Sequence, residues 1–132
     1  MAAIPDEAKH LFENKDFAHV ATINPDGTPQ VSAVWIGMDG DLITFNTAEG
    51  RVKPKNLRAN PAVAVSIHNQ ENPYENLIVQ GKVVELTPEG ADEDIDALAK
   101  RYLDADSYPF RQPDEERVIV KIQPEKVFHM AP

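Results

Sequence analysis

Cysteine is absent from the 132-residue sequence. The chain therefore has no disulfide, no thiolate nucleophile and no cysteine ligand for zinc or an iron–sulfur cluster. Basic residues are also scarce, with 13 Lys and Arg against 22 Asp and Glu and a formal net charge of −9. Binding to nucleic acid needs a broad basic surface, so we expect no nucleic-acid partner.

Long apolar runs and an export signal are missing as well. No stretch approaches the roughly 18 apolar residues of a membrane span. The first residues include Asp6 and Glu7 instead of a basic segment followed by an apolar one. We therefore expect no membrane association and a cytoplasmic location. The length suits a single domain, residues 1–132, with a real core.

Familiar catalytic and metal-binding signatures do not occur. The four histidines lie far apart in the chain and lack the close pairing of zinc motifs, so we expect no metal site. A phosphate-binding Walker loop, a nucleophile elbow and a Gly-x-Gly-x-x-Gly turn are all absent. The catalytic residues stay unknown at this stage, and if the protein is an enzyme its reactive atoms belong to a bound cofactor.

Strand patterns and turn signals alternate along most of the chain. Apolar alternation and hairpin turns predict six strands, at Ala18–Ile23, Pro29–Met38, Leu42–Asn46, Ala62–Ile67, Asn76–Leu86 and Arg117–Gln123, with residues 126–130 extending the last. Short helices are expected at Pro5–Glu13, after Gly50, and from Thr87 to about Ala105. Gly81 lies inside a strand and predicts a bulge. The fold class is mainly β (α+β), an antiparallel barrel with short helices.

A basic stretch stands out in this acidic chain. Eight consecutive positions hold four of the thirteen basic side chains, Arg51, Lys53, Lys55 and Arg58. Gly50 permits a tight turn before them, and proline, here Pro54, is tolerated only in the first turn of a helix. A helix N-terminus with these charges around it suits a phosphate group. The alternative, in which the charges only solvate a surface helix, stays open.

The order of these segments resembles the split β-barrel family of pyridoxamine 5′-phosphate oxidase-like proteins. Three segments carry the resemblance: residues 19–35 (HVATINPDGTPQVSAVW), 47–65 (TAEGRVKPKNLRANPAVAV) and 79–86 (VQGKVVEL). It extends over most of the chain, from Phe17 to Gln123. It implies a six-stranded antiparallel split β-barrel, a homodimer, and a flavin or deazaflavin site at the subunit interface.

The resemblance also implies which residues hold the cofactor. Its phosphate would be held by Thr47, Arg51, Lys53, Lys55 and Asn56. Its ring would lie along the strand that contains Gln30, Ser32, Ala33, Val34 and Trp35. Asn76 occupies the position from which an amide of the partner subunit approaches the cofactor in some relatives.

One departure from the family pattern narrows the function. The true pyridoxamine phosphate oxidases carry an Arg and a Lys on the strand where this chain has Ser32 and Gly37, so their reaction is not expected here. The strand TPQVSAVW and the loop RVKPKNLR are more similar to the branch that uses the deazaflavin coenzyme F420. Lys53, Lys55 and Arg58 would serve the polyglutamate tail of that coenzyme.

The implied activity is an oxidoreductase that uses reduced F420 to reduce a conjugated small molecule such as an enone, a quinone or a tetrapyrrole. Two alternatives stay open. One is an FMN-binding oxidoreductase of the same family, with FMN as the cofactor. The other is a carrier or sensor that binds a flavin or F420 without turnover.

Overall fold

The computed structural model describes residues 2–132, which form seven strands and three helices. The helices are a 3₁₀ helix η1 (Asp6–Phe12), α1 (Val52–Ala59) and α2 (Ala91–Leu103). The strands are β1 (Ala18–Ile23), β2 (Pro29–Val34), β3 (Gly37–Asp39), β4 (Leu42–Ala48), β5 (Ala62–His68), β6 (Asn76–Thr87) and β7 (Arg117–Met130). No helix in the described part of the chain has the length and apolar character needed to cross a membrane.

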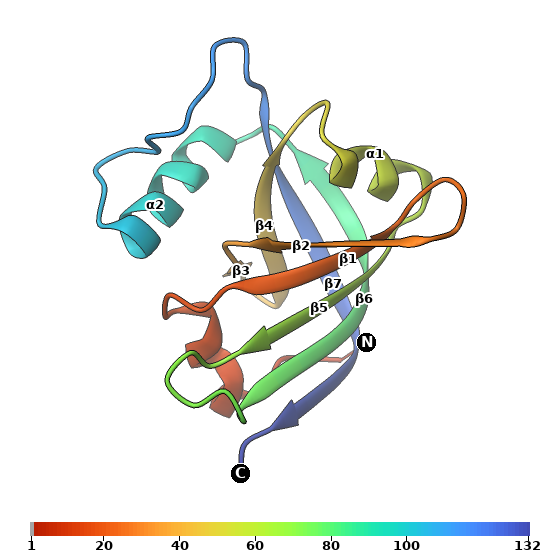
Figure 1. The fold of residues 1–132 in the computed structure, drawn as a ribbon, viewed down its shortest axis with the longest axis vertical. Coiled ribbons are helices and arrows are strands. Elements are labelled where there is room, and N and C mark those ends of the chain that lie inside the picture. Colours follow the sequence, from red (N-terminus) through yellow and green to blue (C-terminus); the bar gives the residue numbers. More distant parts are fainter. Residues whose placement is uncertain (1) are drawn as a thin grey trace.

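The strands make one antiparallel sheet in the order β2-β1-β5-β6-β7-β4-β3. Among the described residues the end strands β2 and β3 do not pair, so the sheet curls around the core without closing. Figure 1 shows α1 and α2 on the two sides of β4, at the end of the sheet where β7 begins. The prediction of a mainly β, antiparallel fold with short helices is confirmed.

The prediction of six strands was wrong, because the segment expected to run from Pro29 to Met38 is two strands. Trp35 and Ile36 interrupt the strand, and the side chain of Ile36 is fully buried. The Ile36 N–H donates to the Tyr102 hydroxyl at 3.1 Å, and its carbonyl accepts from Arg101. Side chains of α2 therefore satisfy this peptide in place of a neighbouring strand.

The helix boundaries follow local chemistry with one exception. α1 ends at Ala59, because Asn60 precedes a proline and adopts an extended conformation. The predicted start of α2 at Thr87 was wrong. Thr87 is the last residue of β6, and its hydroxyl accepts from the N–H of Glu89 in the following turn. α2 begins only after Gly90, which has φ +73°.

The core lies inside the curled sheet, and the largest fully buried side chains are Phe45, Leu11, Ile36, Ile43, Ile67 and Leu77. Gly81 does mark an irregularity, since the pairing of β6 with β7 shifts between Gln80 and Gly81. A second, smaller apolar cluster joins α2 to the end of β2, through Ile95, Leu98 and Tyr102 with Trp35 and Tyr108 against them. This second cluster forms one wall of the site described next.

Candidate functional site

A cleft of about 210 Å³ lies between α1, α2 and the sheet. One end of it is lined by polar residues from β4 and the start of α1, which are Thr47, Arg51 and Lys53. The other end is lined by apolar and aromatic residues, which include Trp35, Leu98 and Phe110. The cleft therefore suits an elongated ligand with an anionic end and a flat apolar end.

The local sequence explains the polar end. β4 delivers Thr47, and Gly50 then turns the chain with φ +88°, a conformation that glycine adopts without strain. The first turn of α1 contains no acidic residue and no side-chain cap, whereas the first turn of α2 contains Asp92, Glu93 and Asp94. The N-terminus of α1 is therefore left for an external anion.

The surroundings of Lys53 disfavour the charge on its ammonium group. Burial, and secondly the nearby charge of Arg51, lower the pKa of Lys53 below 10.5. Its ammonium donates to the Ser32 hydroxyl at 2.7 Å, and within residues 2–132 no carboxylate lies at ion-pair distance from it. The Thr47 hydroxyl is buried beside it without a hydrogen-bond partner. An anion bound here would pair with the Lys53 ammonium and the Thr47 hydroxyl, which is favourable because a buried polar group without a partner costs free energy.

The apolar end is a tier of aromatic rings. Trp35 lies flat on Tyr102, and Tyr108 meets Trp35 edge to face at 6.0 Å between ring centroids. Phe110 continues the tier at 5.7 Å from Tyr108 and is 59% exposed at the mouth of the cleft. Such a surface stacks well on a flat conjugated ring.

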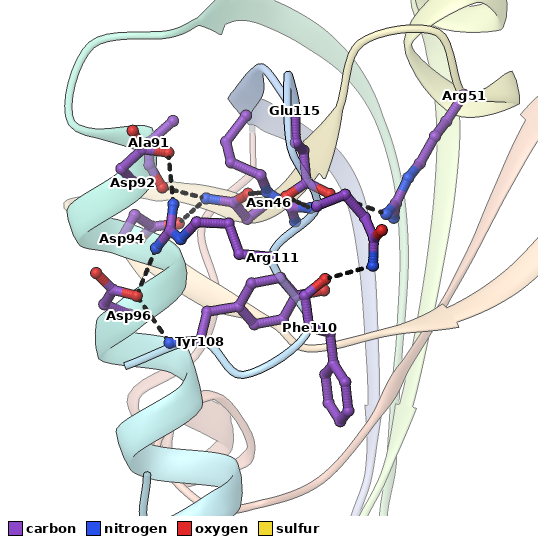
Figure 2. A network of polar contacts seen from close by, with 12 residues as sticks. Asn46, Arg51, Ala91, Asp92, Asp94, Asp96, Tyr108, Phe110, Arg111 and Glu115 are labelled. Atoms are coloured by element: carbon purple, nitrogen blue, oxygen red, sulfur yellow. Dashed lines mark hydrogen bonds and ion pairs between the residues drawn. The ribbon is translucent and has the colours of Figure 1, made fainter. Parts of the chain in front are cut away.

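A buried arginine connects the two ends. Arg117, the first residue of β7, donates from Nε to Asn46 Oδ1 at 2.8 Å and from Nη1 to Glu115 Oε1 at 3.1 Å. The amide of Asn46 donates in turn to the Ala91 carbonyl and to Asp94 in α2. Burial raises the pKa of Asp94, while the bond from Asn46 opposes that effect. Figure 2 shows this network, with Arg51 extending from beside α1 toward Glu115.

The structure brings together only part of the site predicted from sequence. Ala33, Val34, Trp35, Thr47, Arg51 and Lys53 line one cleft, and Ser32 contacts Lys53. Gln30 lies farther along β2, where its amide oxygen accepts from Thr22 at 3.4 Å. Lys55 is exposed on α1 and does not line the cleft.

Three further predicted residues lie outside the cleft of this chain. Asn56 is buried and donates to Thr22 and to Asn24, which fastens α1 to β1. Arg58 makes a two-pronged pair with Glu49, with both N···O distances 2.6 Å, and this pairing lowers the pKa of Glu49. Asn76 lies at the start of β6, paired with His68 and Met130.

Sequence reasoning did not place Ile95 and Leu98 of α2 in the site, because they carried only a helix periodicity. Tyr108 and Phe110 belong to the loop before β7, whose sequence has no pattern that would assign positions to single residues. Arg117 offered a signal, because an arginine that opens an otherwise apolar strand must find buried partners. Asn46 was missed although it stands directly before Thr47.

The chain is similar to several known proteins. The family model described as "Pyridoxamine 5'-phosphate oxidase" matches residues 4–131. A solved structure named "F420 Reductase" is 35% identical over 95% of this chain and 98% of its own, with a TM-score of 0.82. A conserved hypothetical protein from Mycobacterium tuberculosis is 22% identical over 97% and 86% of the two chains, with a TM-score of 0.75. General stress protein 26 from Bacillus anthracis is 16% identical over 96% and 93%, with a TM-score of 0.72, and like the mycobacterial protein it shows the fold alone.

Proposed function

Since the chain belongs to the pyridoxamine 5′-phosphate oxidase family of split β-barrels, we propose that it is an oxidoreductase that uses reduced F420 to transfer a hydride to an electron-poor conjugated small molecule. The observation that carries the proposal is the cleft with Arg51, Lys53 and Thr47 at one end and a tier of aromatic rings at the other. The similarity to a protein named F420 reductase supports the choice of cofactor.

The residues at the polar end fit a phosphate group. Lys53 lacks a carboxylate partner among the described residues, and the buried Thr47 hydroxyl has no partner either. Arg51, Lys53 and Thr47 would hold the phosphate of F420 through charge-assisted hydrogen bonds, with Ser32 keeping the Lys53 ammonium in place.

The rest of α1 supports F420 over FMN. Lys55 and Arg58 follow Arg51 at spacings of four and three residues, which places all three on one side of the helix. This basic stripe leads away from the cleft along the exposed surface of α1; Arg58 is already paired with Glu49, so Lys55 is the residue of the stripe that would bind a polyglutamate tail. FMN ends at its phosphate and would leave the stripe unused.

The apolar end would position the ring and the substrate. Reduced F420, when bound, supplies a hydride to an electrophilic carbon of the substrate. The protein's part is to hold the ring against Ala33, Val34 and Trp35 and to exclude water with Tyr108 and Phe110. Ser32 and Gly37, in place of the Arg and Lys of the true oxidases, argue against oxidation of pyridoxamine phosphate.

The proposed functional unit is a homodimer. One row of outward side chains crosses five paired strands, from Ala33 in β2 through His19, Ser66 and Ile78 to Phe128 in β7. Ile78 and Phe128 are 44% and 54% exposed, and apolar patches of this kind mark interaction surfaces. Because Ala33 also lines the cleft, a second copy on this face would complete the site. From that copy, Asn76 would approach the cofactor.

Titration of the purified protein with F420 and with FMN tests the proposal. The single tryptophan, Trp35, reports binding through its fluorescence. We expect tighter binding of F420, and turnover when reduced F420 is offered with enones, quinones or biliverdin. Arg51→Ala combined with Lys53→Ala should weaken both cofactors at least tenfold, about 1.5 kcal/mol or more.

The outcomes separate the alternatives. Yellow protein with flavin absorbance and tighter FMN binding would favour an FMN-dependent oxidoreductase. Tight F420 binding without turnover of any tested acceptor would favour a carrier or sensor. Unchanged affinities in the double variant would show that the phosphate lies elsewhere. A mass near 14.7 kDa in solution would contradict the dimer.

A further inference from the structure

Glu115 places a carboxylate directly behind the cations of the cleft. Its Oε2 lies 3.7 Å from Arg51 Nη2 and its Oε1 lies 3.1 Å from Arg117 Nη1. The side chain is only 6% exposed, and that of Arg117 only 3%. Figure 2 shows Glu115 and the side chain of Arg51 converging from the loop and from the start of α1.

The position of this carboxylate is fixed by its surroundings. Arg117 is held by Asn46 and lies over the ring of Tyr108, with its guanidinium carbon 5.1 Å from the ring centroid. Next to Glu115, the carbonyl of Glu116 accepts from the N–H of Glu49 at 2.9 Å, which fastens the loop to the turn before α1. These contacts hold the Glu115 carboxylate beside Arg51 and Arg117 in the folded protein.

The charge of the anion site follows from these contacts. Arg51, Lys53 and Arg117 all line the cleft, and Glu115 is paired with two of the three. One negative charge among three positive ones lowers the attraction for any anion, and the reduction scales with the charge of the ligand. A ligand with two negative charges loses twice as much as a ligand with one.

We propose that Glu115 is a specificity-determining residue that reduces the preference of the cleft for a doubly charged phosphate monoester over a singly charged phosphodiester. The inference rests on the proposed function and explains how this site would discriminate between its two candidate cofactors. The phosphate of FMN is a monoester with a second pKa of about 6, so it is largely dianionic at pH 7.5. The phosphate of F420 is a diester and carries one charge.

A matched pair of ligands isolates this effect. FMN and its phosphate methyl ester share ring and side chain and differ by one charge on the phosphate. Dissociation constants for both are measured at pH 7.5 and 0.1 M salt for the wild-type protein, for Glu115→Gln and for Glu116→Gln. Glutamine keeps the shape of Glu115 and its oxygen acceptor for Arg117. Glu116 is exposed and its side chain makes no hydrogen bond or ion pair with the described residues, so its variant controls for the loss of one charge from the same loop.

The expected result is a change in the ratio of the two affinities. In Glu115→Gln, the affinity for FMN should rise about tenfold more than that for the methyl ester. The ratio in Glu116→Gln should stay within about twofold of wild type, because an exposed charge is screened by salt. A purely structural role of Glu115 would change both affinities by the same factor.

Two contrary results have different meanings. If the wild-type protein binds these ligands and F420 but the ratio is the same in Glu115→Gln, the inference is overturned and the proposed function stands. If the wild-type protein binds none of FMN, its methyl ester and F420, the proposed function fails and the inference fails with it.

Discussion

The ring of Trp35 lies flat against that of Tyr102, with centroids 5.2 Å apart and planes 9° apart. Tyr102 belongs to α2, and its hydroxyl accepts from the Ile36 N–H and donates to the Asp16 carbonyl at 2.6 Å. One buried side chain therefore fixes the end of β2, the segment before β1 and the aromatic wall of the cleft. The same hydroxyl holds the Ile36 N–H in the interruption between β2 and β3.

Tyr102→Phe should destabilise the protein while keeping the aromatic ring that packs against Trp35. The variant keeps the ring under Trp35 but leaves the buried Ile36 N–H and Asp16 carbonyl unpaired. We expect the free energy of unfolding to fall by about 1–3 kcal/mol in urea denaturation. Tyr74→Phe is the matched control, because Tyr74 is 74% exposed, and its effect should stay within about 0.5 kcal/mol. Equal unfolding midpoints for the two variants would contradict the assignment.

Most of the fold follows from local sequence signals, and the exceptions have a common cause. β1 matches its predicted range, and β4, β5 and β6 extend one or two residues beyond theirs, since alternation and turns are local. The break in the strand at Ile36 depends on a contact between segments far apart in the chain, and Thr87 stays in β6 because it pairs with Ile119 of β7. Tyr102 lies 66 residues from Ile36, so local sequence patterns such as alternation and turn signals do not predict the hydrogen bond between them.

The residues of the candidate site likewise fall into those that the sequence predicts and those that only the structure reveals. Arg51 and Lys53 are close together in the basic stretch that composition singled out, and the family resemblance added Thr47. Glu115 and Arg117 are distant from them and entered only through the pairing of β4 with β7, which sets Ala48 opposite Arg117. Arg58 looked equivalent to Arg51 in sequence, but its pairing with Glu49 is visible only in three dimensions.

Lys53→Met should stabilise the ligand-free protein while weakening its binding to phosphate-bearing cofactors. The pKa of Lys53 is lowered by burial and by Arg51, so its charged form is disfavoured in the folded state. This penalty exists at neutral pH and disappears as the pH rises from the lowered value toward 10.5. Urea denaturation should therefore give the variant a higher free energy of unfolding at pH 7, with the gap narrowing as the pH approaches 10.5.

Lys55→Met provides the comparison for that experiment, since Lys55 is exposed on the same helix and should change stability by less than about 0.5 kcal/mol. Cofactor affinity of Lys53→Met, followed through Trp35 fluorescence, should drop about tenfold. A variant that loses stability at pH 7 would show that the bond to Ser32 outweighs the cost of burying the ammonium.

Gly81→Ala should be strongly destabilising although the substitution is small. A Cβ at Gly81 would collide with the Gln123 carbonyl of β7 and lie 3.1 Å from Ile122 Cγ2. The backbone of β7 cannot shift there without a cost in free energy, so we expect the free energy of unfolding to fall by about 1–3 kcal/mol. Lys82→Ala, at the exposed next position, should have little effect. A Gly81→Ala protein as stable as wild type would mean that β6 and β7 separate easily at this bulge.

Glu75 joins three distant segments at the end of the barrel away from the cleft. Its Oε1 accepts from His10 of η1 at 2.8 Å and from Asn69 at 3.0 Å, and its Oε2 accepts from His129 of β7 at 2.9 Å. Burial alone would raise the pKa of Glu75, but the hydrogen bonds from Asn69, His10 and His129 lower it to about 2. The ionised carboxylate therefore stabilises the folded state.

Glu75→Gln should consequently reduce stability at neutral pH and lose that effect in acid. The folded pKa of about 2 lies below the reference value of 4.5, so the unfolded chain binds a proton that the folded chain does not between these two values. The contribution of Glu75 is complete above pH 4.5 and declines as the pH falls toward 2. Urea denaturation at pH 6, 4 and 3 should show a gap between wild type and Glu75→Gln that narrows in this order. Glu125→Gln, an exposed change on β7, should follow wild type throughout. A gap that is constant from pH 6 to pH 3 would mean that Glu75 acts through its shape and not through its charge.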